Sequence, residues 1–223
     1  MKIAIIIPAH NEAKAIGPLV EAVRALRYDC IVIDDGSSDQ TGEVALSAQA
    51  IVLKTGYKSG KGNALKMGFD YALKNDYEAL IAMDGDGQHA PGDLAAFVAC
   101  YQRTGADLIN GNRMGNTKDM PWLRRATNRF MSWLISLFCH QTIPDTQCGY
   151  RLIKTDVLRS IKLESSDFEI ETEVLIKASK KGFKIASVNV ETIYRDEVSK
   201  INPVRDTLRF IAYLGRELLR KND

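Results

Sequence analysis

The sequence has few cysteines and no long apolar stretch, and both absences exclude classes of protein. The four cysteines are Cys30, Cys100, Cys139 and Cys148, and no two of them form a C-x-x-C pair. This spacing argues against a zinc site or a disulfide framework and is typical of the reducing cytosol. No run approaches the roughly 20 apolar residues that span a bilayer. The apolar start of the chain is also too short for a signal peptide, so we expect a cytoplasmic protein that at most lies on a membrane.

A strong net charge and a glycine-rich phosphate loop are missing as well. The formal net charge is +2, so the overall charge does not indicate a nucleic-acid partner. The segment Gly60-Lys61-Gly62 lacks the G-x-x-x-x-G-K-[ST] spacing of a P-loop, and no G-x-G-x-x-G follows the first apolar run. A P-loop kinase or a dinucleotide-dependent dehydrogenase is therefore disfavoured. Lys61 is equally consistent with a solvated charge in a loop and with a contact to the substrate.

Apolar runs and helical periods alternate along the first half of the chain. Continuous apolar runs predict buried strands, whereas apolar residues spaced by three and four predict helices. The predicted strands are 2–9, 30–33, 50–53, 79–83 and 107–110, and predicted helices lie at 13–26, 64–73 and 92–101, with another after Asp39. This order indicates βαβ units and one α/β domain with a mostly parallel central sheet flanked by helices.

The second half of the chain is less regular and locally basic. We predict helices at 121–139, 168–181 and 203–220, and a strand at 183–192. Between 113 and 154 the basic residues outnumber the acidic ones, which favours either a phosphate-binding surface or a solvated basic face. The helix at 203–220 is amphipathic and basic, so it is typical of an interfacial anchor, although packing against the sheet explains it equally well. Both alternatives stay open at this point, as does a homo-oligomer contact.

Carboxylates follow the predicted strand 79–83 directly, as Asp84-Gly85-Asp86. An Asp-x-Asp pattern alone is more typical of a turn than of a site. However, ligands of parallel sheets bind beyond the C-terminal ends of the strands, and polar residues gather at four such ends, 8–12, 34–39, 84–89 and 111–113. Because Mg²⁺ and Mn²⁺ prefer oxygen ligands, we interpret Asp84 and Asp86 as a divalent-cation site.

Six motifs in order resemble those of family-2 glycosyltransferases with the GT-A fold. They lie at 8–12, 33–39, 84–89, 111–113, 145–151 and 168–171. The resemblance covers almost the whole chain. Within the family, the chain is similar to the dolichyl-phosphate mannose synthase branch, whose members pass a sugar from a nucleotide donor to a polyprenyl phosphate. It implies a single GT-A (Rossmann-like) domain over 1–223. Within it, 1–113 would bind the nucleotide sugar, 114–202 the acceptor, and 203–223 would form an amphipathic C-terminal helix.

The resemblance also implies roles for individual positions. Asp84, Asp86 and Gln88 would hold the Mg²⁺ or Mn²⁺, and Asp84, Asp86, Arg113 and Arg129 would form the catalytic set. The positions implied to bind the nucleotide sugar are Pro8, His10, Glu12, Ile33, Asp35, Asp84, Gly85, Asp86, Arg113, Arg195 and Lys200. His10 stands where mannose-transferring relatives often carry tyrosine, so the nucleobase and the sugar remain open.

We therefore predict an inverting, metal-dependent transfer of a sugar to a polyprenyl (dolichyl or undecaprenyl) phosphate by a peripheral protein on the inner face of the cell membrane. Such an acceptor is already anionic and needs no general base, whereas a hydroxyl acceptor needs one. The alternative is a family-2 enzyme that acts on a hydroxyl of a glycan or glycolipid in cell-surface polysaccharide synthesis. Glu169 or Glu171 would then be the first base to test. A nucleotidylyltransferase or a non-catalytic binding protein fits the motifs less well.

Overall fold

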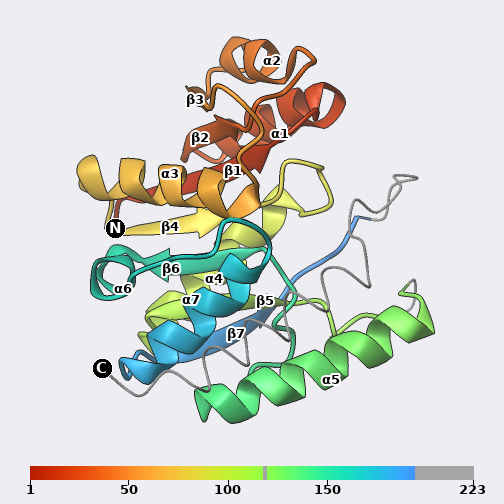
Figure 1. Ribbon diagram of the computed structural model, residues 1–223, viewed down its shortest axis with the longest axis vertical. Helices are drawn as coiled ribbons and strands as arrows, with labels where there is room; N and C mark the ends of the chain where they lie inside the picture. Colours follow the sequence, from red (N-terminus) through yellow and green to blue (C-terminus); the bar gives the residue numbers. More distant parts are fainter. Residues whose placement is uncertain (118–119, 194–223) are drawn as a thin grey trace.

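Seven strands form one sheet in the computed structural model, which describes residues 1–117 and 120–193 (Figure 1). The strands are β1 (Ile3–Ala9), β2 (Asp29–Asp34), β3 (Ile51–Lys54), β4 (Ala79–Ala82), β5 (Leu108–Asn112), β6 (Arg151–Lys154) and β7 (Ile185–Asn189). Their spatial order is β3-β2-β1-β4-β6-β5-β7. Only β6 runs against its neighbours β4 and β5, and the other pairs are parallel. The predicted α/β fold with a mostly parallel sheet is confirmed.

Helices cover both faces of this sheet. They are α1 (Ala13–Ala25), α2 (Thr41–Ser47), α3 (Lys61–Lys74), α4 (Leu94–Thr104) behind a 3-10 turn (Pro91–Asp93), α5 (Trp122–Cys139), α6 (Thr155–Ser160) and α7 (Glu169–Lys180). One core packs α1, α2 and α4 against the sheet, and the other packs α3, α5, α6 and α7 against the opposite face. The short helix α6 was not predicted, and α3 begins three residues before the predicted helix, at Lys61.

The central strand β1 shows why the apolar runs become buried strands. Successive side chains point to opposite faces of a strand, so Ile5 and Ile7 pack in one core and Ile6 in the other. All three isoleucines are fully buried. A strand that is apolar on both faces is stable only between two layers of helices, and β1 and β4 occupy that place at the centre of the sheet.

The order of the strands reverses between β1 and β4. The chain runs outward from β1 through β2 to β3 and then returns to the other side of β1 as β4. Ligands of open α/β sheets bind at this kind of reversal, beyond the C-terminal ends of the strands. The two ends are in close contact here, because a Cβ atom on Gly85 would lie 3.0 Å from the carbonyl oxygen of Pro8.

The second half of the described chain ends near this place as well. The 84–89 segment contacts the segment after β7, through a bridge between His89 and Thr192 and a hydrogen bond from Ile193 N–H to the carbonyl oxygen of Gln88 (2.9 Å). The predicted helix at 203–220 lies outside the described residues. Within 1–117 and 120–193, none of the helices combines the length and the apolar character needed to cross a bilayer.

Candidate active site

Asp84 and Asp86 lie directly beyond β4, at the reversal of the strand order. Asp86 Oδ1 accepts a hydrogen bond from Gln88 N–H (2.9 Å), which orients this carboxylate within a tight turn. Burial and the charge of Asp84 raise the pKa of Asp86. Burial also acts to raise the pKa of Asp84, but neighbouring positive charges, Lys61 first and Arg113 more weakly, lower it overall. The two carboxylates thus repel each other, and a shared cation relieves such repulsion.

His89 closes the turn behind the carboxylates. Asp84 N–H donates to His89 Nδ1 (3.1 Å), so the proton of the neutral ring is on Nε2, which lies 4.0 Å from Asp84 Oδ2. The ring stacks on Tyr150, with centroids 4.8 Å apart. Burial lowers the pKa of His89 and outweighs the opposing effect of the two aspartates. His89 therefore supports the position of Asp84 as an uncharged side chain.

Lys61, the first residue of α3, binds two carboxylates in this site. Its Nζ lies 2.6 Å from Asp84 Oδ1 and 2.7 Å from Glu171 Oε1. The ammonium also lies 5.5 Å from the ring centroid of Phe168. Only 17% of the lysine side chain is exposed. Lys61 is consequently a buried part of the site, and the interpretation as a solvated loop charge is excluded.

The loop before Lys61 is held by Asp35 at the end of β2. Asp35 Oδ1 accepts hydrogen bonds from the N–H and hydroxyl of Ser59 (both 2.7 Å), and Oδ2 accepts one from Gly60 N–H (2.9 Å). These donors, together with Thr55, lower the pKa of Asp35 although burial opposes them. On its other side the loop meets the chain before α7, where a Cβ on Gly62 would lie 2.6 Å from the carbonyl carbon of Ser166. The glycines around Lys61 thus allow close backbone packing.

A small pocket beside Lys61 reaches toward β6 and α7. Its polar lining consists of Lys61, Asp84, Arg151 and Glu171, and Gly149 forms part of its wall. A Cβ on Gly149 would lie 2.9 Å from Glu171 Oε1 and 3.0 Å from Asp84 Oδ2. Arg151 is fully buried and donates to backbone carbonyls of Cys148 (2.8 Å) and Thr146 (2.7 Å) and to that of Glu171. It therefore fixes the 145–151 motif against α7.

Arg113 forms a buried, two-pronged ion pair with Asp145. Its Nε lies 2.8 Å from Oδ2 and its Nη2 3.1 Å from Oδ1, and the backbone N–H of Arg113 also donates to Oδ2 (3.1 Å). Asp145 has no exposed surface. Planar pairs of this kind are the strongest arginine–carboxylate contacts. Arg113 could therefore contact a phosphate, as predicted, only while it keeps this ion pair with Asp145.

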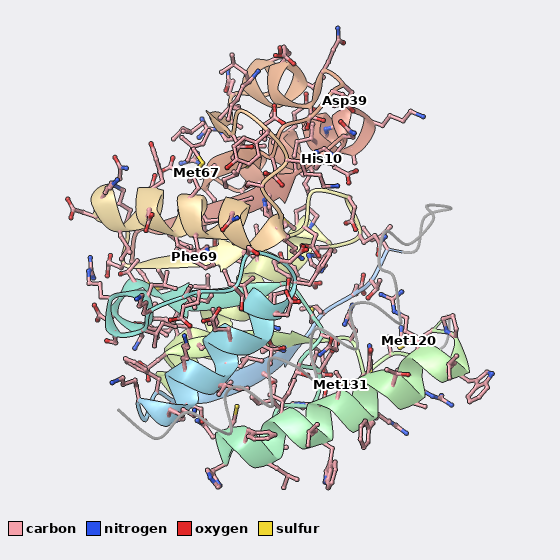
Figure 2. The ribbon with its side chains drawn as sticks, viewed as in Figure 1. His10, Asp39, Met67, Phe69, Met120 and Met131 are labelled. Carbon is pink, nitrogen blue, oxygen red and sulfur yellow. The ribbon has the colours of Figure 1, made fainter. Side chains whose placement is uncertain are left out.

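The predicted nucleoside residues gather at the ends of β1 and β2. Pro8 and Ile33 lie in register on these strands, and His10 Nδ1 donates to the carbonyl oxygen of Asp35 (2.8 Å). Glu12 N–H donates to Thr41 Oγ1 (2.8 Å), which ties the start of α1 to the start of α2. Figure 2 shows His10 near the labelled Asp39, in the loops beyond these strands. The side chain of Ile33, however, is fully buried in the core, so only its backbone can face a nucleoside.

The remaining predicted residues are divided between the site, the surface and the residues that are not described. Arg129 is exposed on α5, and Gln88 is half-buried in the turn that contains Asp86. Arg195 and Lys200 lie outside the described residues. The structure thus brings together Asp84, Gly85 and Asp86 with the ends of β1 and β2, and it does not place Arg129 in that group.

The donor set around Asp84 fits a hard divalent cation. Across the described part of the chain, no group of three or more His, Cys, Asp and Glu side chains is arranged to hold a metal ion. Mg²⁺ is commonly bound by one or two carboxylates, with substrate phosphates and waters completing the shell. Asp84 and Asp86 match this pattern, and the absence of a side chain at Gly149 leaves Asp84 accessible from the pocket. Oxygen ligands without thiolates favour Mg²⁺ or Mn²⁺ over softer metals.

Comparison with known proteins identifies the family. Residues 4–162 match the profile of glycosyl transferase family 2. The chain belongs to this family. It is therefore a glycosyltransferase, as the motifs predicted, and its single α/β domain with a mostly parallel sheet is GT-A-like.

Named relatives align over most of their length. The chain is 31% identical to the polyprenol monophosphomannose synthase of Mycolicibacterium smegmatis, over 95% of this chain and 86% of that protein. It is 29% identical to a UDP-N-acetylglucosamine–dolichyl-phosphate N-acetylglucosaminyltransferase of Methanococcus voltae, over 87% of this chain and 86% of that protein. Among solved structures, glucosyl-3-phosphoglycerate synthase of Mycobacterium tuberculosis superposes with a TM-score of 0.74 at 19% identity, over 100% of this chain and 80% of that chain. This last likeness concerns the fold alone.

Sequence reasoning missed or left open several residues of the site. The sequence indicated Glu171 only as a base to test. Gly149 and Arg151 lay within the 145–151 motif and had no predicted role of their own. The signal for Lys61 was its position between two glycines just before the predicted helix 64–73, because glycine allows close approach of another backbone. Its partners come from β4 and α7, which lie far from it in the sequence, so no local pattern could reveal them.

Proposed function

We propose that this glycosyltransferase transfers a sugar from a nucleotide-sugar donor to a polyprenyl phosphate, with inversion at the anomeric carbon and with a divalent cation at Asp84 and Asp86. The observation that carries the proposal is the pair of carboxylates beyond β4, at the point where the strand order reverses. Relatives named for transfer to a polyprenol, dolichyl-phosphate or undecaprenyl-phosphate acceptor support the choice of acceptor class.

The cation site follows from the chemistry of the donor. A nucleoside diphosphate must leave with its negative charge stabilised, and a cation bound by Asp84 and Asp86 supplies that stabilisation. Solved structures of similar fold support the choice of metal, since glucosyl-3-phosphoglycerate synthase is described in complex with Mn²⁺ or Mg²⁺ and uridine diphosphate. Gln88 is positioned in the same turn as Asp86 and is the proposed third protein ligand.

The nucleoside would lie beyond β1 and β2. His10 and Asp35 form one wall there, because the His10 ring binds the backbone of Asp35. Pro8 lies near the end of β1, next to Gly85, and Glu12 directly precedes α1. We assign the half-molecule 1–113 to the donor, with Arg195 and Lys200 as further proposed phosphate contacts outside the described residues.

The surroundings of Glu171 favour an acceptor that needs no base. Glu171 Oε1 lies 2.7 Å from Lys61, and Oε2 lies 4.0 Å from Arg151. Both oxygens of this carboxylate thus face cationic side chains of the protein, which leaves little room for the hydroxyl of an acceptor. A polyprenyl phosphate carries its nucleophilic oxygen already ionised, and attack from the side opposite the leaving diphosphate inverts the anomeric centre. Arg113 and Arg129, in or near the half 114–202, are the proposed cationic partners of the acceptor phosphate.

The exposed face of α5 supports a position at a membrane surface. Five of its large apolar side chains are exposed, namely Trp122 at 73%, Leu123 at 61%, Phe130 at 60%, Trp133 at 57% and Leu137 at 53%. We call these five residues the α5 apolar face. In Figure 2 the labelled Met131 lies on the other side of α5, toward the body of the protein, where it packs against the core.

Arginines accompany the α5 apolar face, and this combination matches a lipid surface. Arg124, Arg125 and Arg129 lie on the same helix. Tryptophan and cationic residues are enriched at the interface of a bilayer with water, and basic amphipathic helices bind anionic lipids there. We therefore propose peripheral attachment to the inner face of the cell membrane through α5, which would bring the enzyme to a lipid-linked acceptor.

Acceptor assays test this proposal. The purified protein is incubated with Mg²⁺ or Mn²⁺, a panel of nucleotide sugars, and either undecaprenyl phosphate or the same polyprenol without its phosphate. We expect a glycosylated lipid only with the phosphate, identified by its mass, with an anomeric configuration by NMR opposite to that of the donor. Transfer to the free polyprenol hydroxyl or to a glycan hydroxyl, abolished by Glu171→Gln, would replace the proposal with the hydroxyl-acceptor alternative.

A further inference from the structure

The ammonium of Lys61 occupies the approach to the carboxylate that the cation needs. It lies 2.6 Å from Asp84 Oδ1, the distance of a direct ion pair. Glu171 Oε1 contacts the same ammonium at 2.7 Å. Phe168 lies beyond it, and most of the lysine side chain is shielded from solvent. The contact is therefore a buried three-membered cluster of two carboxylates and one cation.

The fold places Lys61 there despite an unfavourable local position. A cation at the N-terminus of a helix is repelled by the positive end of the helix dipole, and Lys61 is the first residue of α3. Gly60 adopts φ 99°, which favours glycine, and directs the chain into this position. Asp35 then holds the loop through Ser59 and Gly60. Asp84 and Glu171 must offset the dipole, so the lysine is a built-in component of the cluster.

We propose that Lys61 is a resident counter-ion of Asp84 that a divalent cation must displace, so that Lys61 sets the affinity of the site for the metal. The inference rests on the proposed function, because it takes Asp84 and Asp86 as metal ligands. An ammonium and a divalent cation repel each other strongly at the same oxygen. Glu171 provides a second carboxylate that keeps the displaced ammonium close by. Lys61 thus affects the metal indirectly, through its contact with the ligand Asp84.

This arrangement makes cation binding depend on the donor. In the free enzyme the cation competes with Lys61 for Asp84, which weakens binding. A nucleoside diphosphate brings further oxygen ligands for the cation and negative charge for the released ammonium. The cation is then expected to bind weakly alone and much more tightly together with a nucleoside diphosphate.

Measurement of Mn²⁺ affinity in variants tests the competition. In the absence of nucleotide, Lys61→Met is expected to bind Mn²⁺ roughly 10-fold more tightly than the original protein by electron paramagnetic resonance, the size of effect that a neighbouring charge has on an ionised group. Lys61→Arg keeps the charge and should remain close to the original protein. Lys74→Met, at the exposed end of the same helix, removes an equal charge and should change little. Equal or weaker Mn²⁺ binding by Lys61→Met overturns the proposal.

A second measurement needs no variant. The reactivity of Lys61 toward an acetylating reagent, mapped by mass spectrometry, should rise when the original protein is saturated with Mn²⁺, while that of Lys74 stays constant. Continued protection of Lys61 at saturation contradicts displacement. If Asp86→Asn abolishes Mn²⁺ binding but Lys61→Met matches the original protein, only the inference about Lys61 fails. If no protein binds Mn²⁺ with or without nucleotide, the metal-dependent function itself fails.

Discussion

The site beyond β4 and the α5 apolar face both depart from the usual distribution of side chains. The site buries charged groups, whereas α5 exposes apolar ones. In the site, charged groups are withdrawn from water, with 17% of the Lys61 side chain and 15% of the Glu171 side chain exposed. On α5, two tryptophans and three other large apolar residues are more than half exposed. Buried charges and exposed apolar surface both weaken a free protein. These departures support the partners proposed for each region, a cation with phosphates in the site and a lipid surface at α5.

The two regions also lie on different elements. α5 runs along one end of the long axis in Figure 1, and its apolar face is exposed on the side away from the core. The site is built instead by the turn after β4 and by β6, α3 and α7, which carry Arg151, Lys61 and Glu171. A substitution in one region should consequently leave the property of the other region intact, and this separation makes the comparison testable.

The largest effect is expected from Asp86→Ala. Removal of this carboxylate should lower kcat at least about 100-fold, because a metal that stabilises a leaving group contributes several kcal/mol to the transition state. The melting temperature should change little, since Asp86 makes its one described side-chain hydrogen bond within its own turn. Binding to anionic liposomes should stay unchanged. Near-normal turnover in the variant would remove Asp86 from the proposed metal site.

Asp145→Asn should instead reduce stability. The variant leaves Arg113 buried without its counter-charge, which typically costs about 3–5 kcal/mol, measured as a loss in the free energy of unfolding in urea. The matched control is Asp156→Asn, which disrupts an exposed ion pair with Arg159 and should have almost no effect. A loss equal to that of the control would show that the Arg113–Asp145 pair is not important for stability.

The stability difference between the original protein and the same variant should depend on pH. Burial acts to raise the pKa of Asp145, but the hydrogen bond and charge of Arg113 lower it overall. A carboxylate with a lower pKa in the folded chain contributes stability above its unfolded pKa of about 4, and this contribution is lost as the pH falls through the folded pKa. The stability difference between the original protein and Asp145→Asn should thus be constant near neutral pH and shrink below about pH 4.

These two aspartates show what the sequence allows one to predict. Asp86 follows a continuous apolar run, so its place at the end of a buried strand was evident from the local pattern, as were the strands and most helices. The partner of Arg113 lies 32 positions away, and no periodicity connects them. The antiparallel direction of β6 was equally hidden, because it depends on tertiary packing between β4 and β5 rather than on a βαβ unit.

A smaller effect on activity is expected from Gly149→Ala. The added Cβ would lie 2.9–3.1 Å from the carboxylates of Glu171 and Asp84, so these groups must shift by a few tenths of an ångström. We expect turnover to fall roughly 10-fold, since sub-ångström misplacement of catalytic groups has effects of this order. Gly92→Ala is the control, because a Cβ there meets no atom within 4 Å. Equal activity of both variants would mean that the carboxylates tolerate displacement.

The Gly60–Gly62 segment and the α5 apolar face mark the limit of sequence reasoning. Both glycines were visible and their spacing argued against a P-loop, but no local pattern could show that they pack against the backbone of Ser166. On α5, the period of three and four predicted the helix correctly. It could not show which face would be buried, because Trp133 and Leu134 are both apolar and only Leu134 packs against the core.

The smallest effect, and the one that separates the two regions most clearly, is expected from Trp133→Ser combined with Leu137→Ser. These residues lie on the α5 apolar face and are 57% and 53% exposed, so their loss should leave the melting temperature nearly unchanged. Binding to liposomes of anionic phospholipid should weaken about 10-fold, because burial of a large apolar side chain contributes roughly 1.5–3 kcal/mol and these two are only partly buried at an interface. Leu46→Ser, equally exposed on α2 at 64%, is the matched control and should not affect binding. Transfer to a short, water-soluble polyprenyl phosphate should continue at the original rate in all of these variants. Unchanged liposome binding by the double variant would assign the α5 apolar face to a contact between protein chains.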